Sequence, residues 1–264
     1  MRRGMTYRQN RKRIIRKKNS RVSMAILFCC LMLLSVFPPA ACAVEVSKQN
    51  WAFEFLRHGN IMTLKTNQYT ADRPVIVFFP GTLESDSIVN TARWIQKYGL
   101  YDDLEADVIA ACFRSKPLKP NDWEGPVGDL LEFLKEKHEA AAFPVVCDAV
   151  SASGYGGCYL VQLFNESGIP VRELNLADAC IPRYVNEEWI RELAAMGTQV
   201  NIWGCRASGS MSAEARRLIE VLQGTENVGG AVLDTTHGQV LRRAMDDYGV
   251  HAEYRRTKST EGTN

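Results

Sequence analysis

The stretch Pro144-Val-Val-Cys-Asp-Ala-Val-Ser-Ala-Ser-Gly-Tyr-Gly-Gly157 decides the predicted fold of this chain. It begins with an apolar run typical of a buried strand, passes through serines among small residues, and continues into an apolar helical segment. Small residues beside a turn allow a strand and the following helix to pass close to each other. The stretch therefore predicts a strand, a sharp turn near Ser151 and a helix.

The sequence alone allows three registers, which place Ser151, Ser153 or Gly154 at this turn. With Ser151 at the turn, alanine and serine stand two residues away on either side, an imperfect match to the G-x-S-x-G pattern of a nucleophile elbow. Ser153 is an alternative nucleophile, but Tyr155 would then occupy a position that needs a small residue. A third register aligns Ala152-Ser-Gly-Tyr-Gly-Gly157 with the common string G-x-S-x-G-G. It puts Gly154 at the turn and leaves no nucleophile.

Other segments support the first register through their order along the chain. Pro74-Val-Ile-Val-Phe-Phe-Pro-Gly-Thr82 reads as a buried strand that ends in a Gly-Thr turn. Asp234-Thr-Thr-His-Gly238 follows the apolar run Ala231-Val-Leu233 and opens an amphipathic helix. Over roughly residues 50–255 the chain resembles the α/β-hydrolase superfamily of serine esterases and lipases, in which the triad residues follow in the order serine, acid, histidine.

This resemblance implies a function and a set of site residues. Ser151 would be the nucleophile and His237 the general base, with an oxyanion hole built from the backbone of Thr82 and Ala152. The implied reaction is hydrolysis of a carboxylic ester or related acyl bond of a small molecule through an acyl-enzyme. It requires no cofactor and no metal.

The acid of the triad is the hardest residue to assign. The family commonly carries an aspartate a few residues after the strand that ends at Gly204, whereas this chain has Cys205-Arg-Ala-Ser-Gly209. Asp178 follows the strand after the elbow, a position that some members of the family use, and we expect it to be the acid. Asp148 and Asp234 are second candidates.

A non-catalytic function is the alternative. The register that puts Gly154 at the turn, and the lack of an aspartate after Gly204, are also what a pseudoenzyme would show. The scaffold would then act as a binding or assembly module. The segment Gly154-Tyr-Gly-Gly157 lacks the full spacing of a dinucleotide-binding motif and a P-loop lysine, so we do not expect a nucleotide cofactor.

Charge is unevenly distributed along a chain of otherwise ordinary composition. The 264 residues are 23% charged and 46% hydrophobic, as in a globular protein. Residues 1–43 hold 10 of the 32 Lys and Arg residues and no acid, so the remainder has 22 basic against 30 acidic side chains. This acidic body argues against nucleic acid as a partner. The oligomeric state is not determined by the sequence.

Residues 1–43 are predicted to be a secretory signal peptide. A basic segment, Arg2–Arg21, precedes the apolar core Met24–Phe37, and Ala41-Cys-Ala43 matches the small-x-small cleavage rule. The apolar core is shorter than the roughly 20 residues that span a bilayer. We therefore expect an exported protein that begins at Val44 and meets the membrane only through its leader. An uncleaved leader would instead anchor it.

The mature chain alternates predicted strands and helices. We expect a single domain over residues 44–255, with an N-terminal hairpin, followed by a disordered tail at 256–264. Continuous apolar strands joined by helices predict a doubly wound, mostly parallel α/β sheet with helices on both faces. Only one helix is predicted between Asp178 and Val200, which leaves little material for a lid. The hairpin strands are expected at 51–57 and 60–65, and the others at 75–79, 107–113, 173–177, 199–203 and 230–233, with the strand of the Pro144–Gly157 stretch ending at about Val150.

Five of the eight cysteines lie in the mature chain. Four of them, Cys112, Cys147, Cys180 and Cys205, fall near the ends of predicted parallel strands. None has the C-x-x-C spacing of a common metal site, and cysteine is among the most buried residue types. We expect them to pack in the core.

Overall fold

The computed structural model describes residues 51–55, 59–64, 74–81, 88–113, 123–138 and 145–255. The predicted signal peptide, the predicted tail and Thr82 lie outside these ranges. Among the described residues, no helix has both the length and the apolar character needed to cross a membrane.

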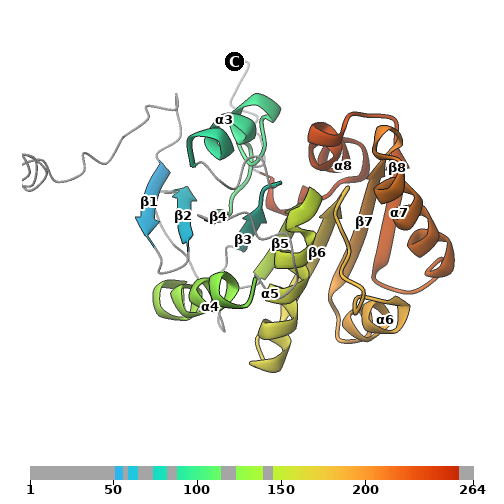
Figure 1. Ribbon diagram of the computed structural model, residues 1–264, viewed down its shortest axis with the longest axis horizontal. Helices are drawn as coiled ribbons and strands as arrows, with labels where there is room; N and C mark the ends of the chain where they lie inside the picture. Colours follow the sequence, from blue (N-terminus) through green and yellow to red (C-terminus); the bar gives the residue numbers. More distant parts are fainter. Residues whose placement is uncertain are drawn as a thin grey trace, which may run out of the picture. The chain divides into compact units, whose positions relative to one another are not determined.

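One eight-stranded sheet runs through the described chain in the order β1-β2-β4-β3-β5-β6-β7-β8 (Figure 1). The first two strands form an antiparallel hairpin, and β2 pairs antiparallel with β4. From β4 onward every neighbouring pair is parallel. The strands are β1 (Trp51–Phe55), β2 (Gly59–Leu64), β3 (Val75–Phe79), β4 (Asp107–Phe113), β5 (Val145–Val150), β6 (Val171–Ala177), β7 (Gln199–Cys205) and β8 (Val228–Leu233).

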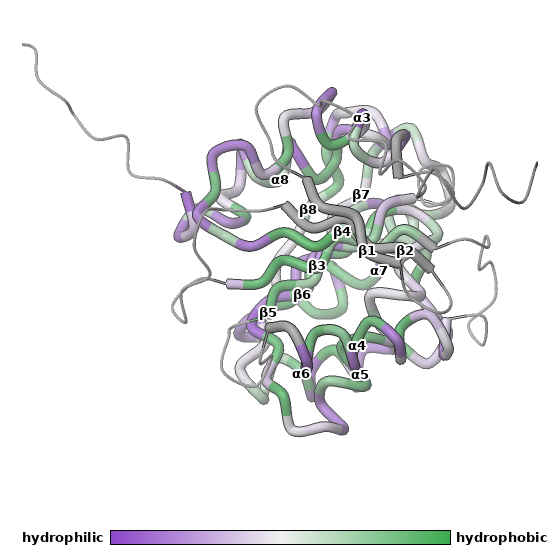
Figure 2. Tube along the Cα trace, turned by 90° about the vertical axis from the view of Figure 1, so that its left-hand side faces the viewer, coloured by the Kyte–Doolittle hydropathy of each residue, from purple (hydrophilic) through white to green (hydrophobic). Residues whose placement is uncertain are grey.

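Helices cover both faces of this sheet, as the alternating sequence predicts. Figure 2 shows α3 and α8 on one side of the strands and α4, α5 and α6 on the other. Apolar side chains of α7 belong to the same core layer as those of α4, α5 and α6. The helices are α3 (Ile88–Tyr98), α4 (Glu124–His138), α5 (Gly154–Glu166), α6 (Glu187–Ala195), α7 (Ser210–Val221) and α8 (Val240–Tyr248).

The core therefore has two apolar layers. All residues of β3 and β5 are buried, because helices pack against both faces of these central strands. Phe79, Trp123 and Leu130 lie in the layer under α4 to α7. Phe78 and Leu241 lie in the layer under α3 and α8.

Several strands extend beyond their predicted bounds. β6 begins at Val171, two residues before the predicted start, because backbone pairing to β5 continues past the exposed Arg172. β7 continues through Cys205, since Gly204 and Cys205 pair with β8. The last helix begins at Val240, after a 3₁₀ turn at His237–Gln239. A single helix, α6, separates β6 from β7, as expected.

The five cysteines of the described chain, Cys112, Cys147, Cys158, Cys180 and Cys205, are free thiols. All but Cys180 are buried, which agrees with the expected packing role.

Candidate active site

Ser151 occupies the sharp turn between β5 and α5. The strand ends at Val150, and Ser151 has a φ of 59°, a left-handed conformation that non-glycine residues rarely adopt. Its carbonyl oxygen accepts a hydrogen bond of 2.8 Å from the backbone N–H of Cys180. This bond holds the strained residue against the loop that follows β6. The turn therefore takes the first of the three registers.

The glycines of the elbow allow close packing and do not form the turn. Gly154 has a helical φ of −53° and is the first residue of α5. A Cβ on Gly154 would lie 2.4 Å from the carbonyl oxygen of Cys180. A Cβ on Gly157 would lie 2.6 Å from that of Ala149. Small residues are required here because the helix crosses directly over β5 and the loop after β6.

Ser153, the alternative nucleophile, is buried with 1% of its surface exposed. Its hydroxyl donates a hydrogen bond to the carbonyl oxygen of Pro80, at the end of β3. Ser153 thus joins the elbow to the segment Pro80–Gly81. Ser151, in contrast, is partly exposed.

Asp178 lies at the corresponding turn after β6 and also has a positive φ, 48°. Its Oδ2 atom lies 2.5 Å from Nδ1 of His237, in the 3₁₀ turn after β8. A carboxylate only accepts hydrogen bonds, so Nδ1 carries the proton and the Nε2 lone pair is left as the basic site. The structure thus joins the expected acid to the expected base.

Cys205, the last residue of β7, and Ser208, in the 3₁₀ turn that follows, complete the surroundings of Asp178. The backbone N–H of Cys205 lies 3.3 Å from Oδ1 and its Sγ atom 3.2 Å from Oδ2, and Ser208 donates its hydroxyl to Oδ2. The sequence shows only that the usual aspartate is missing from this loop. Cys205 at the end of β7 and Ser208 of this loop instead donate hydrogen bonds to Asp178, which follows the neighbouring strand β6.

These donors determine the charge of the site. Burial alone would raise the pKa of Asp178, but hydrogen bonds from His237, Ser208 and Cys205 outweigh burial and lower the pKa below its ordinary value. Burial raises the pKa of the Cys205 thiol. The pair at neutral pH is therefore an ionised carboxylate and a neutral thiol.

The two second candidates for the acid lie in other environments. Asp234 has an exposed side chain 3.9 Å from the guanidinium of Arg206. Asp148 is fully buried and accepts a hydrogen bond of 2.8 Å from the hydroxyl of Tyr101. The expected oxyanion hole stays a prediction, because Thr82 lies outside the described residues. Ala152 directly follows Ser151 in the turn.

A row of polar residues crosses the middle of the sheet and includes Asp148. Strand register aligns Asp148 with Asn175, Asn201 and Gly229 on successive strands. The amide of Asn175 donates to Asp148 at 2.8 Å, and the amide of Asn201 donates to Asn175 at 2.9 Å. The amides of Asn175 and Asn201 thus point toward β5, the strand that precedes Ser151.

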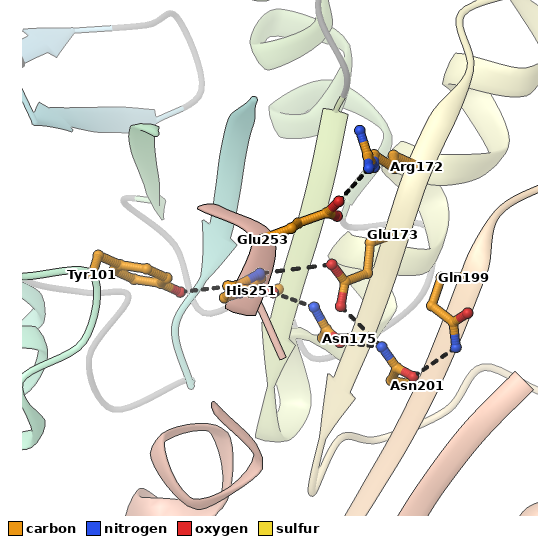
Figure 3. Close-up of polar contacts among 9 residues, drawn as sticks. Tyr101, Arg172, Glu173, Asn175, Gln199, Asn201, His251 and Glu253 are labelled. Atoms are coloured by element: carbon orange, nitrogen blue, oxygen red, sulfur yellow. Dashed lines mark hydrogen bonds and ion pairs between the residues drawn. The ribbon is translucent and has the colours of Figure 1, made fainter. Parts of the chain in front are cut away.

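His251 closes this network from the segment after α8 (Figure 3). Its Nε2 atom lies 2.9 Å from Oδ2 of Asp148, and its Nδ1 atom lies 3.7 Å from Oε2 of Glu173. Burial alone would lower the pKa of His251, but the two carboxylates raise it to about 10. No local sequence pattern indicates this cluster, because its members are far apart in the chain. A groove of about 630 Å³ lies beside it, lined in part by Arg172 and Gln199.

Among the comparisons with known proteins, only the one with solved structures found similar proteins. No protein-family model matches the chain, and no curated protein matches it. The strand order, with a serine elbow after β5 and a histidine after β8, is that of the α/β-hydrolase fold, and this chain has that fold.

Several esterases are among the solved structures that are similar to this chain. The enterobactin esterase FES from Shigella flexneri is 14% identical with a TM-score of 0.52, over 78% of this chain and 60% of that chain. The HSL homolog EstE7 from a metagenome library is 14% identical with a TM-score of 0.49, over 79% and 82%. An esterase/lipase from an uncultured bacterium is 10% identical, with a TM-score of 0.49, over 73% and 77%. With 14% identity and a TM-score of 0.52, the Shigella esterase shows a likeness of fold alone.

Proposed function

We propose that the chain is a serine hydrolase that cleaves a carboxylic ester or related acyl bond of a small molecule. The observation that supports this most is the 2.5 Å contact between His237 and Asp178, at the edge of the sheet where Ser151 takes the strained turn. A serine hydroxyl needs a base that takes its proton, and the base needs an acid that fixes its tautomer.

In the proposed reaction His237 Nε2 takes the proton of the Ser151 hydroxyl as the oxygen attacks the carbonyl carbon of the substrate. Asp178 stabilises the imidazolium that forms. The tetrahedral intermediate expels the alcohol, which receives the proton from His237, and leaves an acyl group on Ser151. Water, activated by the same imidazole, then releases the acid. The N–H groups of Ala152 and Thr82 would bind the oxyanion.

The binding-module alternative loses the two features that favoured it. Gly154 is a helical residue that packs under the Cys180 carbonyl and not the residue at the turn. The loop after β7 lacks an aspartate, but its Ser208, together with Cys205 at the end of β7, donates hydrogen bonds to Asp178. We also propose that the enzyme is exported, on the strength of the predicted leader at residues 1–43.

A fluorophosphonate probe tests the proposed chemistry, because it phosphonylates only an activated serine. We expect one label per chain and none in Ser151→Ala. The matched control is Ser167→Ala, which removes an exposed hydroxyl at the end of α5 and should label normally. Absence of labelling in the wild-type protein, or a label that persists in Ser151→Ala, would count against Ser151 as nucleophile.

A further inference from the structure

The acid–base pair belongs to a cluster of three different metal-binding groups. The Cys205 thiol, the Asp178 carboxylate and the His237 imidazole each offer one ligand atom, and these atoms lie within 4.8 Å of one another. Sγ of Cys205 is 3.2 Å from Oδ2 of Asp178, and Nδ1 of His237 is 2.5 Å from the same oxygen. Cysteine, aspartate and histidine together form a donor set that zinc favours.

The spacing requires little movement to accept an ion. Zinc binds sulfur at about 2.3 Å and nitrogen or carboxylate oxygen at about 2.0–2.2 Å, so the ligand atoms of one tetrahedral ion lie roughly 3.4–3.6 Å apart. Cys205 and Asp178 are buried at the ends of adjacent strands, and their distance is already close to this range. Only the His237 ring must move away from Asp178, and 42% of its side chain is exposed.

We propose that Asp178, Cys205 and His237 form an inhibitory site for thiophilic divalent metal ions such as Zn²⁺. The ion takes the place of the proton on Nδ1 of His237. Cys205 releases its thiol proton to solvent when it binds as a thiolate. Three protein ligands leave a fourth position, which a water molecule or the Ser208 hydroxyl, 2.7 Å from Cys205 Sγ, can fill.

Metal binding stops hydrolysis because it changes the tautomer of the His237 imidazole. With the ion on Nδ1, the ring proton resides on Nε2, and this nitrogen can no longer accept the proton of Ser151. The ion also removes the Asp178 carboxylate from the base. This part of the inference rests on the proposed function, whereas metal binding itself does not.

Two readouts on the full chain test the inference. The first is the ultraviolet charge-transfer absorbance of a thiolate bound to Cd²⁺. The absorbance of each variant with Cd²⁺ is compared with that of the wild type. The second is inhibition of ester hydrolysis by Zn²⁺ and its reversal by EDTA. We expect Cys205→Ala to lose the Cys205 contribution to the absorbance. It should also weaken inhibition by about tenfold or more, since even residues outside the ligand sphere can change metal affinity 10- to 100-fold.

Two further variants make the test specific. Cys180→Ser removes a partly exposed thiol that lies 3.8 Å from the sulfur of Met211 and outside the cluster. It should respond to both metals like the wild type. His237→Ala changes a partly exposed residue and should bind Cd²⁺ about tenfold or more weakly, which provides a second measurement if Cys205→Ala does not fold.

The outcomes separate the two proposals. An absorbance that is unchanged in both Cys205→Ala and His237→Ala, or an increase in turnover with Zn²⁺, would overturn the inhibitory site. Turnover that is insensitive to Zn²⁺, in a protein that reacts with the fluorophosphonate, would overturn the site alone. A Cys205-dependent absorbance in a protein without labelling or turnover would support metal binding and count against the hydrolase.

Discussion

Nδ1 of His237 lies 2.5 Å from Oδ2 of Asp178, although 59 positions separate the two residues in the chain. Asp178 follows β6 and His237 follows β8, so the whole of β7 lies between them in the sheet. Cys205 at the end of β7 and Ser208 in the turn that follows donate hydrogen bonds to the same carboxylate. Three successive strand ends thus build one acid–base unit.

Replacement of Asp178 by asparagine should leave the protein folded and lower kcat by about 10⁴-fold, because the amide no longer holds the imidazole in the required tautomer. Turnover of a short-chain p-nitrophenyl ester measures the effect, and circular dichroism checks the fold. Asp234→Asn changes an exposed carboxylate that lies 3.9 Å from Arg206 and should keep nearly full activity. Near-normal turnover in Asp178→Asn would remove this residue from the triad.

Ser208→Ala removes a hydroxyl that donates to Asp178, so the carboxylate loses one of its stabilising partners. We expect kcat to fall by about tenfold, corresponding to about 1.4 kcal/mol, near the value for a hydrogen bond to a charged group. In the background of Asp178→Asn the same change should cost less, because the two residues act as one unit. Full additivity in this double-mutant cycle would show that Ser208 acts independently of Asp178.

Gly154→Ala should destabilise the protein by about 1–3 kcal/mol, because the new Cβ would lie 2.4 Å from the Cys180 carbonyl oxygen. Gly128→Ala is the matched control, since a Cβ at this position of α4 meets nothing within 4 Å. It should stabilise the protein by up to about 1 kcal/mol through helix propensity. Urea denaturation measures both variants, and equal effects of the two substitutions would contradict the packing account.

The free energy of unfolding should depend on pH through His251. Its pKa is raised from 6.5 to about 10 by Asp148 and Glu173, and Tyr101 also faces the ring. Since the folded state binds the proton more tightly, this stabilisation is fully present below pH 6.5 and is lost as the pH rises through about 10.

His251→Ala tests this dependence. It should cost about 3–5 kcal/mol at neutral pH, because two buried carboxylates lose their cationic partner. The decline of stability between pH 7 and 10 should also be shallower than in the wild type. Chemical denaturation at several pH values measures the free energy of unfolding of both proteins. If this free energy declines with pH equally in the two proteins, His251 does not bind an additional proton in the folded state.

The leader gives a prediction outside the described residues. Exported protein should begin at Val44, because Ala41-Cys-Ala43 follows an apolar segment that is too short to span a bilayer. Mass spectrometry of the intact exported protein measures its N-terminus. Recovery of a chain that still carries residues 1–43 would contradict cleavage, and lipid on Cys42 would indicate a different kind of processing.

The sequence by itself determined the class of fold, the order of the elements and a short set of candidate residues. Apolar runs such as Val75–Phe79, and the run Val145–Val150 interrupted only by Asp148, are local signals, because a strand buried on both faces must be mostly apolar. The same reasoning found His237 after the last strand. It could not choose among the three registers of the elbow, since all of them place a small residue at the turn.

Only the tertiary structure decided which contacts form between distant segments. Gly154 is excluded from the turn by its packing against Cys180, and Asp178 is selected because β6, β7 and β8 bring their ends together. The row Asp148, Asn175 and Asn201 depends on the register of three strands, which no local pattern specifies. The periodicity of a sequence indicates which side chains are buried. Strand pairing across the sheet determines which partner each buried polar group meets.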